Sequence, residues 1–581
     1  MLSRLVHFLL AMFPNRRYNM RMFTTVVIAL ASIAAQGQVE SDQCAQSGIN
    51  LSHIPSWTPS WPFVDAFKIR RPWLSSPSDR SVWDDGQPIS TDTDGWVNSI
   101  LQGQLIHTLI YDNAQGHYPS GRYVVLYEGQ GQLNLRGDAQ IVSDTPGRME
   151  VDITPTNGGI HFEVLATDPQ DHIRNIRLIM PGFEDTYQEH PFHPAFLESL
   201  SSFDVIRFMD WQNTNGTWNH DWTMRPDPDD AGFSLGLGVP IEVMVDLCNE
   251  LDADPWFCMS HRFDDTYVEN FAALVSSKLE PERTVYVEHS NEVWNSIFTQ
   301  YHYAVQRSAE LGIPGGDDFQ RAMRYHSQRS VEIFDLWDDH FTQDQLVRVM
   351  GGWQVNTWVT EQLLDWNNAF EQTDVFATAP YFGGSLGVGN NPIQTLQMTP
   401  DEIIDVCLED IAAQRIRTSA QITTLEQYDG VDLVAYESGQ HIVGVGGQWT
   451  NNAELTALFH EVNRHPRMYD AYIDDISGWN EIGGGLMTAF ASCQTPSRYG
   501  SWGLLEYQDQ PLSEAHKMRA WVDFNTNPAD FTMDGQLDFF DVSAFLTALS
   551  VQDQSADMNS DGVFNFFDVS QFLIAFAKQC M

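Results

Sequence analysis

Thr284-Val-Tyr-Val-Glu288-His-Ser-Asn-Glu292-Val-Trp294 combines a short, apolar, β-branched run with a polar and acidic turn directly after it. A run of this kind predicts a buried strand. Similar runs recur at residues 48–51, 205–209, 255–259, 346–350, 375–378, 432–435 and 486–490, with helical periodicity between some of them at 241–251, 267–279 and 453–463. Repeated strand–helix units imply a parallel sheet, and eight strands predict an α/β fold of the (β/α)8 TIM-barrel type.

A doubly wound open sheet is the rival architecture. Such folds carry a Gly-rich phosphate-binding loop after a strand, and no strand here is followed by one.

Residues 103–181 have a different sequence pattern, in which strand-like alternating runs are separated by Gly- and Asp-rich turns. Examples of these runs lie at 105–110, 123–127, 160–164 and 176–179. This pattern predicts a small all-β insertion in the barrel.

The composition narrows the range of partners. The 78 acidic and 31 basic residues give a net charge of -47, which argues against nucleic acid, anionic membranes and polyanionic substrates. A neutral substrate is the simplest match, although a saline habitat would also favour such a surface. The chain contains 18 Trp, which suit either a large core or the flat apolar platforms of a sugar-binding cleft.

The N-terminus resembles an export signal. Arg16, Arg17 and Arg21 precede an apolar run at 23–35, and Ala35-Gln-Gly37 is a plausible cleavage site. Because the basic region is long, Met20 and Met22 are alternative starts of the chain. We therefore expect residues 1–37 to be a signal peptide and the mature protein to be secreted or held at the cell surface, with no stable membrane span.

The six cysteines form no CxxC motif, so a zinc or redox motif is not expected. They are Cys44, Cys248, Cys258, Cys407, Cys493 and Cys580. Export permits disulfides, and a Cys248–Cys258 bridge and buried free thiols both stay open.

Two glutamates stand where chemistry is expected in a barrel, because catalytic side chains follow the C-terminal ends of strands. Glu292 follows the fourth strand, and Glu437 follows the seventh in Leu433-Val-Ala-Tyr-Glu437-Ser-Gly439. Glycoside hydrolysis needs one carboxyl to protonate the leaving oxygen and another to attack the anomeric carbon, about 5–5.5 Å apart in a retaining enzyme. Strand-end glutamates also commonly cap the next helix.

Asn-Glu after strand four and Glu after strand seven resemble clan A of the glycoside hydrolases. The resemblance implies Glu292 as the acid/base, Glu437 as the nucleophile and Asn291 as the residue that holds the sugar 2-hydroxyl. It implies more loosely that Arg207 holds the nucleophile ionised, that Tyr381 donates a hydrogen bond to Glu437, that His261 lines the cleft and that Trp502 floors a sugar subsite. Arg207 in a structural ion pair and His261 as a satisfied polar residue are the alternatives. Glu288 and Asp432 lie within strands and can point elsewhere, and Asp264 and Asp265 are loop acids that suit solvent or sugar hydroxyls.

Most of residues 48–510 also resemble a group of secreted proteins often labelled cellulose-binding. The similar segments are Phe63-Val-Asp65, Ser290-Asn-Glu-Val-Trp294 and Tyr436-Glu-x-Gly439. This resemblance implies little about activity.

The last part of the chain contains an internal repeat, in which 530–541 and 557–568 are near-copies spaced 27 residues apart. EF-hand-type loops place oxygen ligands at positions 1, 3, 5, 7, 9 and 12 around a Gly at position 6. The predicted Ca²⁺ ligands are Asp530, Thr532, Asp534, Gln536, Asp538 and Asp541 in the first loop, and Asp557, Asn559, Asp561, Val563, Asn565 and Asp568 in the second. We expect the first loop to bind more weakly, because Thr532 is a poor ligand.

Each loop has Asp at position 12 and leads directly into an apolar helix, which resembles a type I dockerin module. The resemblance implies a small α-helical, duplicated calcium module over 524–581, after a barrel over 38–523, and a cohesin-like domain as its partner. The alternative is a C-terminal tail that calcium stabilises and that has no docking partner.

The sequence as a whole favours an O-glycosyl hydrolase, a retaining glycosidase of a β-linked neutral polysaccharide that needs no cofactor for catalysis. A non-catalytic carbohydrate-binding or adhesion protein on a barrel scaffold is the alternative, since barrels host many functions. An assembly scaffold, suggested by the dockerin-like module alone, is the third.

Overall fold

The computed structural model describes residues 46–217, 221–234, 236, 238–532, 537–559 and 562–577. The predicted signal peptide, its cleavage site, Cys44 and Cys580 lie outside these residues. Within them, no helix combines the length and apolar character needed to cross a membrane.

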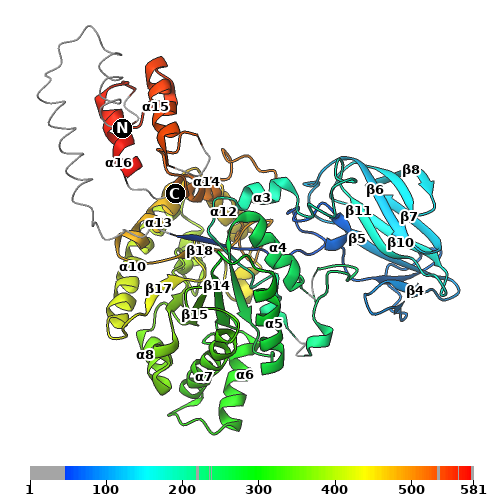
Figure 1. Ribbon diagram of the computed structural model, residues 1–581, viewed down its shortest axis with the longest axis horizontal. Coiled ribbons are helices and arrows are strands. Elements are labelled where there is room, and N and C mark those ends of the chain that lie inside the picture. Colours follow the sequence, from blue (N-terminus) through cyan, green and yellow to red (C-terminus); the bar gives the residue numbers. More distant parts are fainter. Residues whose placement is uncertain are drawn as a thin grey trace, which may run out of the picture. The chain divides into compact units, whose positions relative to one another are not determined.

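Eight parallel strands close into a barrel, which confirms the predicted fold class (Figure 1). In order around the barrel they are β1 (Ser47–Asn50), β12 (Val205–Arg207), β13 (Asp254–Met259), β14 (Val285–His289), β15 (Leu346–Gly351), β16 (Val375–Thr378), β17 (Asp432–Ala435) and β18 (Met487–Ala489). Each strand coincides, within a few residues, with one of the eight predicted runs. The rival open sheet is therefore wrong, because β1 pairs with both β12 and β18.

The barrel closes where β1 meets β18, and a glycine makes that approach possible. A Cβ on Gly48 would lie only 2.8 Å from the Thr488 hydroxyl oxygen. The interior of the barrel is filled by side chains rather than open, as usual for this fold. The filling residues are Val205, Met209, Trp256, Cys258, Tyr286, Val349, Ala377, Val434, Tyr436 and Leu486.

Helices surround the strands (Figure 1). They are α3 (Pro194–Leu200), α4 (Ile241–Leu251), α5 (Asp265–Lys278), α6 (Thr299–Glu310), α7 (Asp318–Asp338), α8 (Thr357–Asp365), α9 (Pro392–Thr395), α10 (Pro400–Leu425), α11 (Gly447–Thr450), α12 (Ala453–Asn463), α13 (Met468–Glu481) and α14 (His516–Asn525). α10 begins at a capping box, in which Thr399 and Glu402 satisfy each other's backbone N–H groups.

Between β1 and β12 the chain forms an all-β module with two four-stranded antiparallel sheets, ordered β2-β5-β10-β7 and β11-β6-β9-β8. The strands are β2 (Leu74–Pro77), β3 (Ser90–Thr91), β4 (Val97–Ser99), β5 (Gln104–Ile110), β6 (Gly121–Glu128), β7 (Gly131–Gly137), β8 (Ala139–Thr145), β9 (Arg148–Ile153), β10 (Ile160–Thr167) and β11 (Arg174–Ile179). The module starts earlier than the expected residue 103, because β2 pairs with β5.

Two further helices, α15 (Phe539–Val551) and α16 (Phe566–Ala577), follow the two repeated loops. Their small core contains Ala529, Phe545, Ala556 and Phe572. Phe545 and Phe572 occupy the same position in the two repeats and stack with ring centroids 4.1 Å apart.

The four described cysteines, Cys248, Cys258, Cys407 and Cys493, are free and buried. The Cys248–Cys258 bridge is therefore not formed, and the free-thiol alternative holds for these residues.

Candidate active site

The polar site is built on the alternation of the barrel strands. Residues two apart on a strand face the same side, so Arg207 shares the barrel interior with Val205, and Glu288 shares it with Tyr286. The register places Arg207 opposite Trp256, and Cys258 opposite Glu288. The three neighbouring strands thus bring one arginine and one glutamate together inside the barrel.

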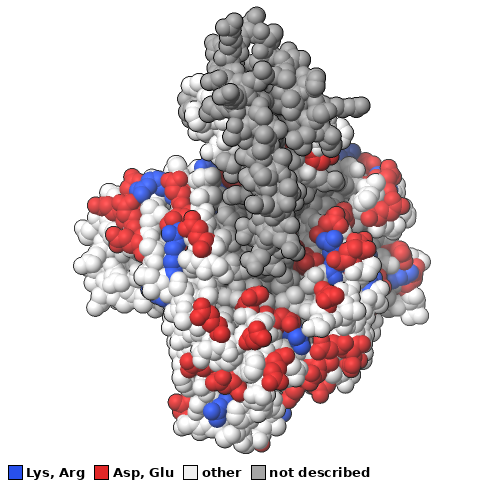
Figure 2. All heavy atoms as spheres, turned by 60° about the vertical axis from the view of Figure 1, so that its left-hand side comes forward, with Lys and Arg blue, Asp and Glu red and all other residues white. Residues whose placement is uncertain are grey.

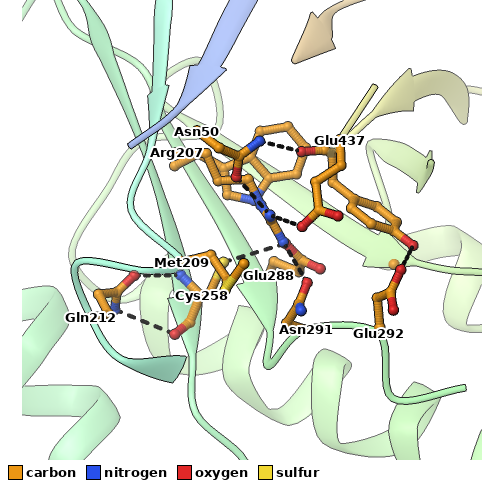
Figure 3. A network of polar contacts seen from close by, with 12 residues as sticks. Asn50, Arg207, Met209, Gln212, Cys258, Glu288, Asn291, Glu292 and Glu437 are labelled. Atoms are coloured by element: carbon orange, nitrogen blue, oxygen red, sulfur yellow. Dashed lines mark hydrogen bonds and ion pairs between the residues drawn. The ribbon is translucent and has the colours of Figure 1, made fainter. Parts of the chain in front are cut away.

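Arg207 is fully buried and lies at the centre of a network drawn in Figure 3. Its Nη2 donates to Glu288 Oε2 at 2.9 Å and to Asn291 Oδ1 at 3.0 Å. Its Nη1 donates to Asn50 Oδ1 at 2.9 Å and to Glu437 Oε1 at 3.1 Å. Arg207 therefore forms the structural ion pair with Glu288 and also contacts Glu437.

Glu288 is the buried counter-charge of Arg207. Trp256 Nε1 also donates to its Oε2 at 3.0 Å. Space for this carboxylate depends on Gly351 of the next strand, because a Cβ there would lie 2.9 Å from Glu288 Oε1. Glu288 therefore belongs to the site as the ion-pair partner of Arg207. From the sequence alone, the direction in which this strand residue points was open.

Glu437 lies just beyond the end of β17 and is only 6% exposed. Besides the bond from Arg207, its carboxylate accepts a hydrogen bond from the Tyr381 hydroxyl at 3.0 Å. The contact proposed between Tyr381 and Glu437 is present. Two donors, one of them cationic, therefore stabilise a negative charge on Glu437.

Glu292 is half-buried and lies in the loop after β14. Its Oε1 accepts from the Tyr436 hydroxyl at 3.2 Å, and its Oε2 accepts from Asn295 Nδ2 at 2.8 Å. The backbone is left-handed at Ser290 (φ 60°) and at Glu292 itself (φ 43°). Such conformations cost energy in residues other than glycine and concentrate at functional sites.

The two carboxyls differ in how their charge is supported. Burial raises the pKa of both above the ordinary range of glutamate, and the charge on Glu292 raises the pKa of Glu437 further. The Arg207 guanidinium opposes both shifts. Glu437 is bonded to this cation, whereas the donors to Glu292 are neutral, so the two carboxyls have unequal support for a negative charge.

Aromatic rings flank both carboxyls. On the side of Glu292, Trp294 stacks on Trp353 with ring centroids 4.9 Å apart and planes 7° apart. On the side of Glu437, Trp502 meets Tyr381 at 5.9 Å and His441 at 5.1 Å. All five rings are half-buried, so each keeps some surface for a ligand. Trp502 therefore lies beside the residue that contacts Glu437.

The remaining predicted residues are less closely tied to the carboxyl pair. His261 follows β13 but packs against Tyr303 at 5.2 Å, and its described contacts do not include either glutamate. Burial lowers its pKa to about 4. Asp264 caps α5 through the Tyr267 N–H, and Asp265 pairs with Arg329.

Several residues of the site were not predicted. They are Asn50, Asn215, Asn295, Trp353 and Tyr436. Tyr436 had a usable signal, because it directly precedes Glu437 at the end of a strand. Asn215 accepts a hydrogen bond from Asn291, but it lies in a short 3-10 turn, η2 (Thr214–Gly216), that no local pattern indicates.

The two C-terminal loops share one arrangement at position 12. Asp541 accepts hydrogen bonds from the Thr532 and Asp538 N–H groups, and Asp568 accepts one from the Asn565 N–H. Asp541 and Asp568 are fully buried, and Asp568 Oδ1 has no hydrogen-bond partner among the described residues. The predicted ligands Asp534, Gln536 and Asp561 lie outside the described residues.

In the second loop, the Gly562 N–H donates to Asp557 Oδ2 at 2.8 Å. In the first, the Thr532 hydroxyl donates to Asp541 Oδ1 at 2.9 Å. Within the part of the chain that the structure describes, no three His, Cys, Asp or Glu side chains gather as a metal site.

No protein-family model and no curated protein matches this chain. Among solved structures, it is similar to a GH51 arabinofuranosidase from Xanthomonas axonopodis pv. citri, with 12% identity over 55% of this chain and 63% of that one, and a TM-score of 0.34. A β-glucuronidase from Bacteroides uniformis matches with 9% identity over 77% of this chain and 50% of that one, with a TM-score of 0.34.

A β-glucosidase from Thermotoga maritima matches with 9% identity over 57% of this chain and 84% of that one, with a TM-score of 0.32. The chain thus spans less than two thirds of the first two structures. Likenesses at this level decide nothing about function, which depends on the site itself.

Proposed function

We propose that this protein is a secreted glycoside hydrolase that cleaves a neutral β-linked polysaccharide with retention of configuration. The observation that carries the proposal is the pair Glu292 and Glu437. They follow the fourth and seventh strands of one barrel, influence each other electrostatically, and have unequal support for a negative charge.

In the proposed mechanism, Glu437 attacks the anomeric carbon as Glu292 gives its proton to the leaving oxygen, so the glycosidic bond breaks as a glycosyl–enzyme ester forms. Glu292, now ionised, then takes a proton from water, which hydrolyses the ester and releases Glu437. Arg207 and Tyr381 hold the nucleophile ionised. The carboxyl separation of a retaining enzyme stays a prediction, which the configuration of the product tests.

The aromatic rings support a sugar as the substrate. The exposed parts of Trp294, Trp353 and Trp502 offer apolar faces of the kind that pack against sugar rings. Asn291 is held by Arg207 and Asn215, and its amide keeps a second N–H with which to hold the sugar 2-hydroxyl.

The surface supports a neutral substrate. The face drawn in Figure 2 carries many more acidic than basic side chains, in line with the net charge of -47. Such a surface repels polyanions.

We propose that the C-terminal module binds two calcium ions, one in each repeated loop. The donor set fits the ion, because it consists of carboxylate, amide, hydroxyl and carbonyl oxygens, and the buried Asp568 Oδ1 lacks a hydrogen-bond donor among the described residues. Asp530, Thr532, Asp538 and Asp541 would hold one ion together with Asp534 and Gln536. Asp557, Asn559, Val563, Asn565 and Asp568 would hold the other together with Asp561.

We further propose that this module docks to a cohesin-like domain. Each repeat exposes two adjacent phenylalanines at the start of its helix, Phe539 and Phe540 in one and Phe566 and Phe567 in the other, with exposures of 53–66%. Exposed apolar pairs of this kind mark interaction sites. In a binding assay against an array of cohesin domains, the double variant Phe540→Ser/Phe567→Ser should lose binding, whereas Val551→Ser should keep it.

The test of the proposed activity is a panel of neutral β-linked glucans, mannans and xylans, assayed with the wild type beside Glu437→Ala. We expect turnover of one polymer by the wild type only, and NMR of the first product should show retained configuration. Binding of a polymer without turnover in the wild type would favour the carbohydrate-binding alternative.

A further inference from the structure

A cavity of about 500 Å³ lies away from the Arg207 network, and none of the residues that line it belongs to that network. Segment 63–68, strands β6 and β11, helix α4 and the loops at 187–192 and 228–233 all contribute to its wall. Its volume falls in the range of small-ligand sites, about 300–1,000 Å³.

The base of the cavity consists of packed aromatic rings. Phe63, Phe192 and Phe233 are buried, and Phe63 contacts the other two with ring centroids 6.0 and 5.6 Å apart. Tyr127 and Tyr187 are half-buried in the wall. The two tyrosines therefore offer aromatic surface to a ligand, whereas the three buried phenylalanines form the packed base of the cavity.

Asp65, the last residue of the Phe63-Val-Asp65 segment, supplies an acceptor. It is 7% exposed, and its Oδ1 accepts hydrogen bonds from the Phe67 and Leu178 N–H groups at 3.0 and 2.8 Å. Its Oδ2 is buried, has no hydrogen-bond partner among the described residues and lies 3.5 Å from Arg177 Nε. A buried acceptor without a donor is costly, so a hydroxyl from a ligand would satisfy it.

The charges around the cavity select against ions. Lys68 and Arg177 line its inner part, with Lys68 Nζ bonded to the Pro228 carbonyl at 2.9 Å, and they disfavour a cation. Glu128, Asp229 and Asp246 are exposed at its rim and disfavour an anion. A neutral ligand remains.

We propose that this cavity is a second saccharide-binding site. A carboxylate beside a guanidinium suits two adjacent hydroxyls, because one hydroxyl donates to Asp65 while its neighbour accepts from Arg177. The half-buried rings of Tyr127 and Tyr187 would pack against the apolar face of the sugar ring. The choice of a β-linked sugar rests on the proposed function.

The test uses the full chain carrying Glu437→Ala, titrated calorimetrically with β-linked tetrasaccharides of glucose, mannose and xylose. We expect two binding events for one of these sugars. Adding Asp65→Asn, or separately Tyr187→Ala, should remove one event or weaken it at least tenfold, whereas Tyr469→Ala, a half-buried tyrosine on α13, should leave both. Near-UV circular dichroism checks that each variant is folded, and Tyr187→Ala carries the test if Asp65→Asn is not.

Two unchanged binding events in both variants, or no second event with any sugar, would overturn the proposal. Hydrolysis by the wild type is read separately. If no sugar is hydrolysed but Tyr187→Ala still removes a binding event, the proposed function fails and the second site stands. If hydrolysis is found and both variants keep two events, the opposite holds.

Discussion

Tyr381 and Tyr436 each donate a hydrogen bond to one of the two carboxylates, and this gives the pH profile a residue-level test. Each bond favours the ionised form of its partner and so lowers that partner's pKa. In Tyr436→Phe the pKa of Glu292 should rise, so the basic limb of kcat/KM should move upward by about 0.5–1 pH unit, the worth of one neutral hydrogen bond.

Tyr381→Phe is the matched variant. It should raise the pKa of Glu437, and because the nucleophile must be ionised, the acidic limb should move upward instead. If Tyr436→Phe moves the acidic limb, or moves the basic limb downward, the assignment of acid and nucleophile is wrong.

Arg207 contacts Glu437 in the site and also contributes to the stability of the barrel through its ion pair with Glu288. In Arg207→Met the fully buried Glu288 loses its counter-charge, and the free energy of unfolding should fall by about 3–5 kcal/mol in urea denaturation. Arg122→Met removes an arginine that is 46% exposed and pairs with Glu150 and Asp152, and it should lower the free energy of unfolding far less, because exposed ion pairs contribute little. Equal losses in the two variants would show that the network contributes no special stability.

The sequence indicated some residues of the site and missed others for a physical reason. Glu292 and Glu437 could be predicted because each follows an apolar strand, and strand ends converge in a barrel. Asn50 ends β1 and Trp353 follows β15, and neither residue has an acidic neighbour that would single out its position as part of a site. Their roles depend on the register and on loop paths, which neighbouring residues do not encode.

At the level of elements, the barrel strands were predictable because burial on both faces makes them continuous apolar runs. β7, β8 and β9 were missed. Their outward faces are polar, as in the alternation of half-buried and buried residues along β9, where Arg, Glu and Asp fill half of the strand. Short strands of this kind resemble loops in composition.

The repeated loop–helix elements predict a metal-dependent module. Removing calcium with EDTA should unfold α15 and α16, seen as a loss of helical circular dichroism, and leave the thermal unfolding of the barrel unchanged. Asp557→Ala or Asp568→Ala should weaken calcium binding at least tenfold in a calorimetric titration, and Thr532→Ala should weaken it less. An unchanged titration in Asp568→Ala would refute the ligand assignment.

At the scale of the whole molecule, one chain combines a barrel with a carboxylate pair, an all-β module and a repeated acidic loop–helix module. The β module shares its aromatic core with the barrel, since Phe63 contacts Trp211 at 5.9 Å. The Phe63-Val-Asp65 segment lies at this junction, where Asp65 forms an isolated bridge with Ile179 of β11. It packs the module against the barrel and also lines the second cavity.

The most direct test of the account is the activity of Glu437→Ala with and without azide, on an activated aryl glycoside of the sugar that the wild type cleaves. Without the nucleophile, turnover should be lost. Azide should restore part of it by entering from the vacated face, and it should yield a glycosyl azide of inverted configuration. Full activity of Glu437→Ala without azide would contradict the two-carboxylate mechanism.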